Sequence, residues 1–272
     1  MLEILQYSFM QRAFIAGIMV AIICSAIGTF IVLKRLSMIG DGLAHIALGG
    51  VALGLFFNVY PIITALLFSA ISALGINRLR KTKVHGDVAI AIFFSAGLAV
   101  AVVLLSLANG FNVNLFSYLF GSILTVNETD LQIVMGLGIL TVGAIILFYK
   151  EFVYLTFDEE SAIVSGIPVD KLNDALVILT AITVVVSIKI VGILLVSSLL
   201  VVPTAISLQI SKNFKETILF STVFAILSVV TGLISSYYFN IATGGAIVLV
   251  SIIFFIAITL YKNYIIKLKS NA

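Results

Sequence analysis

The chain has 272 residues, of which 62% are hydrophobic and only 10% are charged, and its mean hydropathy is +1.27. Soluble domains are about half apolar and about a quarter charged, so this composition excludes a soluble globular enzyme. The formal net charge of +3 is too small to indicate nucleic-acid binding. Long apolar blocks exclude disorder and a porin-type barrel, and they predict an all-α, polytopic protein of the lipid bilayer.

Apolar blocks follow one another along almost the whole chain. The first, residues 13–33, is too long for the apolar core of a signal peptide and lacks a clear cleavage site, so we expect it to be retained. Together the blocks predict about nine crossings, or eight if the pair flanking Lys189 forms a short or broken helix, which Gly192 and Pro203 would allow. We interpret residues 1–272 as a single transmembrane domain. The later blocks lie near residues 39–57, 61–77, 88–108, 131–149, 173–188, 190–208, 217–239 and 244–266.

Basic residues are concentrated on one side of the predicted membrane. With nine crossings, only Arg12 and Lys189 of the 15 lysines and arginines fall on the other side. Cytoplasmic loops collect Lys and Arg, so the pattern predicts an external amino terminus and a cytoplasmic carboxyl terminus. It makes residues 151–171 the longest cytoplasmic loop, and it predicts that Lys189 snorkels to the external boundary. His85, in a basic turn, is interpreted as a solvated loop residue.

The sequence contains no phosphate loop of the G-x-x-x-x-G-K-[ST] type. Any work driven by ATP therefore requires a separate ATPase subunit. We predict that this chain is not an enzyme, with no catalytic residues and no permanently bound cofactor. Its single cysteine, Cys24, allows no intrachain disulfide and no thiolate metal cluster.

Asp41 and His45 stand four residues apart inside the second apolar block, where ionisable residues are expensive. On a helix this spacing puts both side chains on one face, about one turn apart. Carboxylate and imidazole groups suit zinc, manganese or iron. Two ligands hold a metal poorly, but a homodimer with its two-fold axis along the pore would supply four. The alternative is that Asp41 is a helix cap and dipole partner and that His45 is hydrogen-bonded to a carbonyl group.

The predicted cytoplasmic loop carries a pattern of its own. Acidic residues followed by a serine and then by a glycine predict a short helix, with acids in its first turn and a glycine at its end. An acidic segment is a poor match for the anionic surface of a membrane, so contact with a protein is favoured over a loop on the lipid surface. The residues of this pattern are Asp158, Glu159, Glu160, Ser161 and Gly166.

Five strings, in this order, carry a resemblance to a known family. They are KRLSMIGDGLAHIALGGVALG at 34–54, FSYLFGSIL at 116–124, FDEESAIVSGIPV at 157–169, KIVGILLVSSLLVVPTA at 189–205 and SYYFNIATGGAI at 236–247. Together they closely resemble the permease subunits of ABC transporters that import zinc or manganese. The chain departs from the family pattern at Gly49, where the family often has proline, and at 241–244, where it often has I-P-T-G.

The resemblance implies a fold, partners and site residues. The fold would be that of the vitamin B12 and iron-siderophore permeases, in a homodimeric channel within a prokaryotic plasma membrane. Its partners would be an ATP-binding ATPase subunit, an extracytoplasmic metal-binding protein and a second copy of the chain. Asp41 and His45 would hold the transported metal, and the 157–169 segment would be the coupling helix that docks in a groove of the ATPase.

Two rival functions are weighed against this one. An intramembrane aspartyl protease needs a second carboxylate that can share a proton with Asp41, and we expect no other acid deep in an apolar block. A secondary metal transporter would use a chain of intramembrane acids and often two inverted repeats, and the sequence shows neither. The choice between zinc, manganese and iron is left open, because the same ligand types suit all three.

Overall fold

The computed structural model describes residues 6–82, 84, 86–107, 113–122 and 126–270, and within these ranges every regular element is a helix. His85 lies outside them. Eight of the described helices are long and apolar enough to cross a membrane, which confirms the prediction of an all-α polytopic protein. The helices are α1 (Ser8–Leu33), α2 (Ile39–Phe56), α3 (Pro61–Arg80), α4 (Gly86–Leu107), α5 (Val113–Phe120), α6 (Glu128–Leu147), α7 (Tyr149–Phe157), α8 (Glu159–Val164), α9 (Val169–Val191), α10 (Val196–Ile210), α11 (Phe214–Phe239) and α12 (Thr243–Ser270).

The two apolar blocks around Lys189 form one long helix and one short one. α9 has 23 residues, whereas α10 has only 15 and contains Pro203. Gly192 ends α9 with φ at +88°, and a Cβ atom there would lie 2.5 Å from the Leu119 carbonyl oxygen. A side chain at this position would therefore be strained and would clash. Of the two predicted counts, eight crossings therefore agrees with the structure, and α10 is the short helix.

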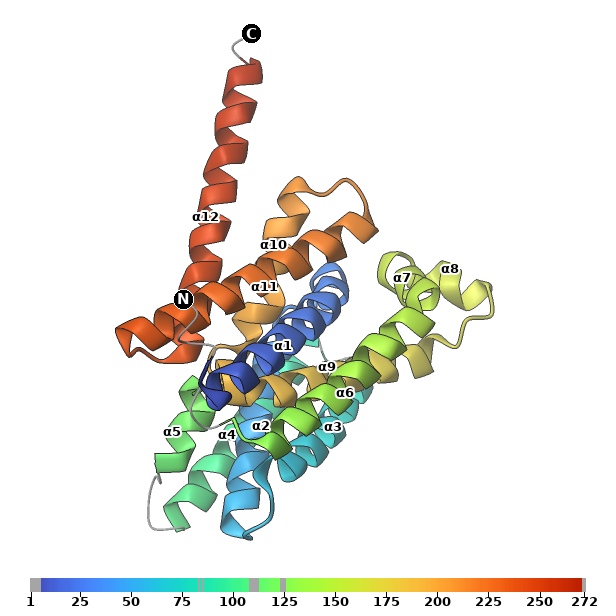
Figure 1. The fold of residues 1–272 in the computed structure, drawn as a ribbon. Coiled ribbons are helices and arrows are strands. Elements are labelled where there is room, and N and C mark those ends of the chain that lie inside the picture. The colour runs from blue at the N-terminus through green and yellow to red at the C-terminus, as the bar shows by residue number, and fades with distance from the viewer. Residues whose placement is uncertain (1–5, 83, 85, 108–112, 123–125, 271–272) are drawn as a thin grey trace.

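α1 lies at the centre of the bundle and α2 forms a second packing centre. α1 packs against α6, α9, α10 and α11, while α2 packs against α3 and α4 (Figure 1). A Cβ atom on Gly28 of α1 would lie 2.0 Å from the backbone oxygen of Leu200 in α10. The two backbones therefore cross in contact, as small residues permit between membrane helices.

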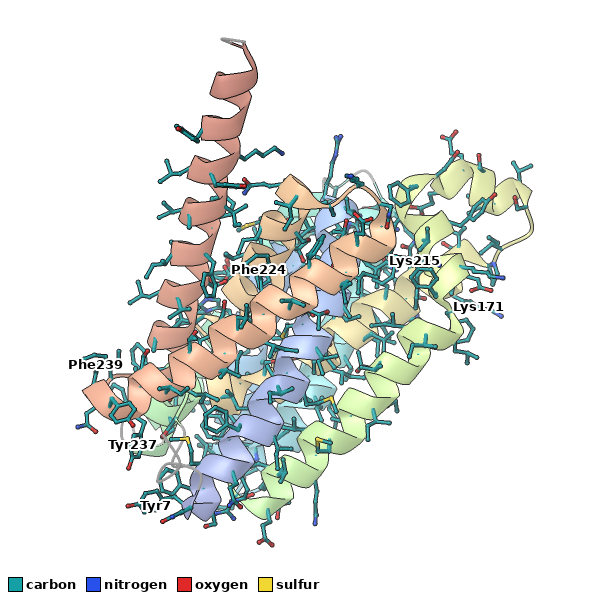
Figure 2. All side chains as sticks on the ribbon, turned by 45° about the horizontal axis from the view of Figure 1, so that its top comes forward. Tyr7, Lys171, Lys215, Phe224, Tyr237 and Phe239 are labelled. Carbon is teal, nitrogen blue, oxygen red and sulfur yellow. The ribbon has the colours of Figure 1, made fainter. Side chains whose placement is uncertain are left out.

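The two ends of the bundle differ in composition. In Figure 2, Tyr7, Tyr237 and Phe239 lie at one end, and Lys171 and Lys215 lie near the other. We call these the aromatic end and the lysine end. α7 and α8 lie at the lysine end. α12 packs against α10 and α11 as far as Thr259, whose hydroxyl donates to Gln209 of α10, and its carboxyl-terminal turns extend beyond the body of the bundle (Figure 1).

A buried ion pair near the aromatic end corrects the prediction that Lys189 snorkels. The Lys189 ammonium lies 3.3 Å from a carboxylate oxygen of Asp130, and their side chains are 13% and 0% exposed. The Tyr60 hydroxyl donates to the same carboxylate, and the ammonium stands 4.8 Å from the centre of the Tyr118 ring. Lys189 therefore pairs instead of snorkelling. Asp130, at the start of α6, is also a buried acid. Its ion pair with Lys189 and its hydrogen bond from Tyr60 offset the free-energy cost of burying its charge.

Candidate metal-binding site

Asp41 is placed in the first turn of α2 but does not cap it. The N-cap position is Met38, and no side-chain hydrogen bond caps the helix. Instead, the hydroxyl of Ser197 at the start of α10 donates to Asp41 Oδ1 over 3.4 Å. A carboxylate in the first turn also interacts favourably with the helix dipole. The capping role considered from the sequence is therefore wrong for Asp41, while its dipole role agrees with this position.

His45 stands one turn further along α2 and has an unused nitrogen. Its Nδ1 atom is buried and has no hydrogen-bond partner among the described residues. The ring packs against Phe94 of α4, with 4.3 Å between ring centroids. A buried polar atom without a partner costs free energy, and a neutral imidazole nitrogen is a common metal ligand. The alternative considered from the sequence, a hydrogen bond from His45 to a carbonyl group, is therefore not made by Nδ1 within the described part of the chain.

One chain alone does not complete a metal site. Within the described part of the chain, no group of three or more His, Cys, Asp or Glu side chains is close enough to hold a metal ion. The buried Asp130 does not add a ligand, because it contacts Tyr60 just beyond the far end of α2. The fifteen residue-to-residue steps from Asp41 to Phe56 alone extend for about 22 Å along the helix axis. Among the described residues, Asp41 and His45 therefore have no third His, Cys, Asp or Glu of the same chain beside them.

The predicted short helix of the 151–171 loop is present as α8. Asp158 is its N-cap and accepts a hydrogen bond from the Ser161 backbone N–H at 2.9 Å. The backbone and hydroxyl groups of Ser161 both donate to this carboxylate, which lowers the pKa of Asp158. Gly166, with φ at +78°, follows the last turn, as the sequence predicts. The sequence did not predict α7, which makes the segment before α8 helical as well.

Lys34 joins α8 to the connection that leads into α2. Its ammonium donates to Asn173 Oδ1 at 2.8 Å and to the Leu155 carbonyl oxygen at 3.3 Å, and it lies 3.5 Å from Glu159 Oε2. Asn173 in turn donates to Glu159 over 2.8 Å. Burial lowers the pKa of Lys34, and the charge of Glu159 partly offsets that effect. The end of α1, five residues before α2, is thus bonded to α7, α8 and α9 through a residue that the sequence analysis did not single out.

The likeness to known proteins covers nearly the whole chain. Residues 6–262 match the model of the ABC 3 transport family. The chain belongs to this family. The manganese transport system membrane protein MntC of Listeria monocytogenes is 36% identical over 256 residues, which are 93% of this chain and 91% of that protein. The high-affinity zinc uptake system membrane protein ZnuB of Haemophilus influenzae is 34% identical over 259 residues, or 94% and 98%.

Solved structures agree with this assignment. The structure of PsaBC from Streptococcus pneumoniae in complex with Fab matches with a TM-score of 0.86 and 34% identity, covering 94% of this chain and 93% of that one. A solved transporter described as an ABC transporter of metal-chelate type, in an inward-facing conformation, matches with a TM-score of 0.74 at 14% identity, covering 93% and 86%. The resemblance to metal-importing ABC permeases and the expected fold are confirmed.

Proposed function

We propose that this chain is the membrane-spanning permease subunit of an ATP-driven importer of divalent transition-metal ions. Membership of the ABC 3 transport family supports the class of transporter. Relatives named for manganese and for zinc transport support the class of cargo. The protein is a multi-pass component of a prokaryotic plasma membrane, with its lysine end in the cytoplasm, in agreement with the preference of lysine and arginine for that side.

Two copies of the chain together hold the metal ion. The observation that carries this proposal is the buried, unpartnered Nδ1 of His45 one helical turn from Asp41. A two-fold axis beside α2 brings a second Asp41 and His45 to the same point, which gives four oxygen and nitrogen ligands. These ligands suit zinc, manganese and iron. The ion is the cargo, so the site must release it, and rotation of one copy against the other removes half of the ligands.

α8 couples the site to a partner ATPase, which binds and hydrolyses the ATP. The acidic first turn of α8 is exposed, so it is available to a partner protein. Lys34 connects this helix to the start of α2, and therefore a displacement of α8 is transmitted toward Asp41. An extracytoplasmic metal-binding protein delivers the ion at the aromatic end.

The two rival functions receive less support. Asp130 is the buried acid that an intramembrane protease would need, but it is paired with Lys189 and lies beyond the opposite end of α2 from Asp41. A secondary transporter would not need a partner ATPase, whereas the family of this chain is one of ABC transporters.

Metal uptake into proteoliposomes tests the proposal. The vesicles contain this chain with its candidate ATPase and capture protein, and the variants are Asp41→Ala and His45→Ala. The matched control is Asp87→Ala, which removes an exposed acid in the first turn of α4. We expect uptake of manganese or zinc that requires ATP, that both site variants lose, and that the control retains. Size-exclusion chromatography checks that each complex assembles. Uptake that survives both substitutions would refute the site, and uptake driven by a proton gradient without the ATPase would refute the ABC mechanism.

A further inference from the structure

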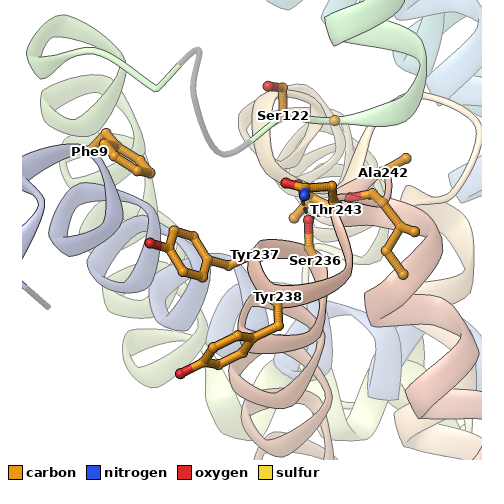
Figure 3. Close-up of a pocket in the computed structure, with 10 residues that line it drawn as sticks. Phe9, Ser122, Ser236, Tyr237, Tyr238, Ala242 and Thr243 are labelled. Carbon is orange, nitrogen blue, oxygen red and sulfur yellow. Dashed lines mark hydrogen bonds between the residues drawn. The ribbon is translucent and has the colours of Figure 1, made fainter. Parts of the chain in front are cut away.

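An apolar groove runs along the outside of the bundle, over the surface of α1. α1 packs against both α6 and α11, and in Figure 2 its ribbon lies between theirs. The groove has a volume of about 490 Å³ and reaches from α6 across α1 to α11. Neither Asp41 nor His45 lines the groove. It also shares no lining residue with the pocket of Figure 3, which lies at the aromatic end beside Tyr237 and Tyr238.

The groove has one polar end and one apolar end. Its side chains recur at spacings of three and four residues, so each flanking helix presents a single face to it. α6 runs toward the lysine end and α11 runs away from it. Tyr149, which follows α6, and Lys215, near the start of α11, therefore lie at the same level and form the polar end of the groove. The two faces consist of Val142, Ile145 and Tyr149 on α6 and α7, and of Lys215, Ile218 and Thr222 on α11.

The length of the groove fits one leaflet of a bilayer. The seven residue-to-residue steps from Lys215 to Thr222 extend for about 10 Å along α11, which is about two thirds of the half-thickness of a hydrocarbon core. The rings of Tyr149 and Phe214 lie 6.0 Å apart and join α7 to α11 at the polar end. Tyrosine and lysine at that level stand where lipid headgroups lie.

The lysine at the polar end of the groove, Lys215, forms no ion pair with any described residue. None of the ion pairs in the described part of the chain involves Lys215. The neighbouring acid, Glu216, is already engaged, because its carboxylate accepts hydrogen bonds from the Lys212 backbone and from the Asn213 side chain. A cation therefore stands at the headgroup level above an apolar floor.

We propose that this groove binds an anionic glycerophospholipid from the leaflet at the lysine end. One acyl chain lies on α1 between α6 and α11, and the phosphate contacts the ammonium of Lys215. A zwitterionic lipid fills the floor equally well but gains less from the lysine, since anionic headgroups are favoured by basic residues near the membrane surface. A free phosphate ion matches the lysine but leaves the apolar floor empty.

The absence of tryptophan from the sequence allows a direct test. A single tryptophan is introduced by Ile146→Trp at the edge of the groove, where Ile146 is 70% exposed, and a control is made by Ile139→Trp on the same helix outside the groove, where Ile139 is 61% exposed. The full-length protein is placed in vesicles containing brominated phosphatidylglycerol or brominated phosphatidylcholine, which quench the tryptophan on contact. The ratio of quenching by the two lipids gives their relative affinity.

At residue 146 we expect phosphatidylglycerol to be preferred over phosphatidylcholine about five-fold, which is the gain in affinity that one lysine near the membrane surface provides. At residue 139 we expect no preference. Adding Lys215→Gln to the Ile146→Trp protein should abolish the preference, while Lys212→Gln, an equal change of charge outside the groove, should preserve it. Equal ratios at the two tryptophans would show bulk lipid only and overturn the proposal. A preference unchanged by Lys215→Gln would also overturn it, and so would a preference removed by inorganic phosphate but not by chloride at the same ionic strength.

Discussion

The buried pair of Asp130 and Lys189 predicts an energetic effect that depends on burial and not on distance. Replacing Asp130 by Asn keeps the shape and the contact with Tyr60 but leaves the Lys189 ammonium, which is only 13% exposed, without a counter-charge. Breaking a buried pair in this way costs about 3–5 kcal/mol of the free energy of unfolding. Replacing both residues, as Asp130→Asn with Lys189→Met, removes both charges and should recover about 1–3 kcal/mol of that loss.

An exposed pair of shorter length provides the control. Lys81 and Asp170 lie 2.6 Å apart, but their side chains are 44% and 81% exposed. Asp170→Asn should therefore lower the free energy of unfolding by less than about 1 kcal/mol. The assay is an SDS titration in mixed micelles followed by circular dichroism. If Asp130→Asn costs no more than Asp170→Asn, or if the double variant is as unstable as the sum of the single variants, the assignment of the buried pair is refuted.

Two further predictions concern helix packing and coupling. Gly28→Ala should lower the free energy of unfolding by about 1–3 kcal/mol, because the new Cβ atom would meet the Leu200 carbonyl oxygen, whereas Gly136→Ala should be neutral or stabilising, since nothing lies within 4 Å of it. The same SDS titration measures both, and equal effects would contradict the close crossing of α1 and α10. Asp158→Ala removes the cap of α8 and should reduce metal uptake per ATP hydrolysed without changing metal binding, while Asp158→Asn, which also caps, should restore it. Unchanged coupling in the alanine variant would argue against a role for α8.

Much of the fold could be predicted from the sequence because each membrane-spanning helix corresponds to a long run of apolar residues. The second block, 39–57, is α2 almost to the residue, and Gly192 with Pro203 correctly marked the short α10. α7 was missed because its nine residues include Lys150 and Glu151 and form no long apolar run. The short amphipathic helices at the membrane surface have no comparably strong signal.

The candidate site was predictable only in part. Asp41 and His45 could be found because a helix brings residues four apart onto one face. The pair of Asp130 and Lys189 could not, because 59 positions separate them and each stands near the end of an apolar block. Lys34 was counted only among the basic residues of the predicted cytoplasmic side, yet it contacts Asn173 and Glu159, which lie more than a hundred positions away in the sequence. A usable signal was that Lys189 is one of only two basic residues on the predicted external side.

The number of metal ions bound by the purified protein tests the central claim most directly. The complex in detergent is equilibrated with manganese or zinc, and the bound metal is measured by mass spectrometry after removal of free ions. A shared site predicts one ion for every two chains, and it predicts loss of that ion in both Asp41→Ala and His45→Ala. One ion per chain, or half an ion per chain that neither substitution removes, would contradict a channel whose metal ligands come from Asp41 and His45 of two copies.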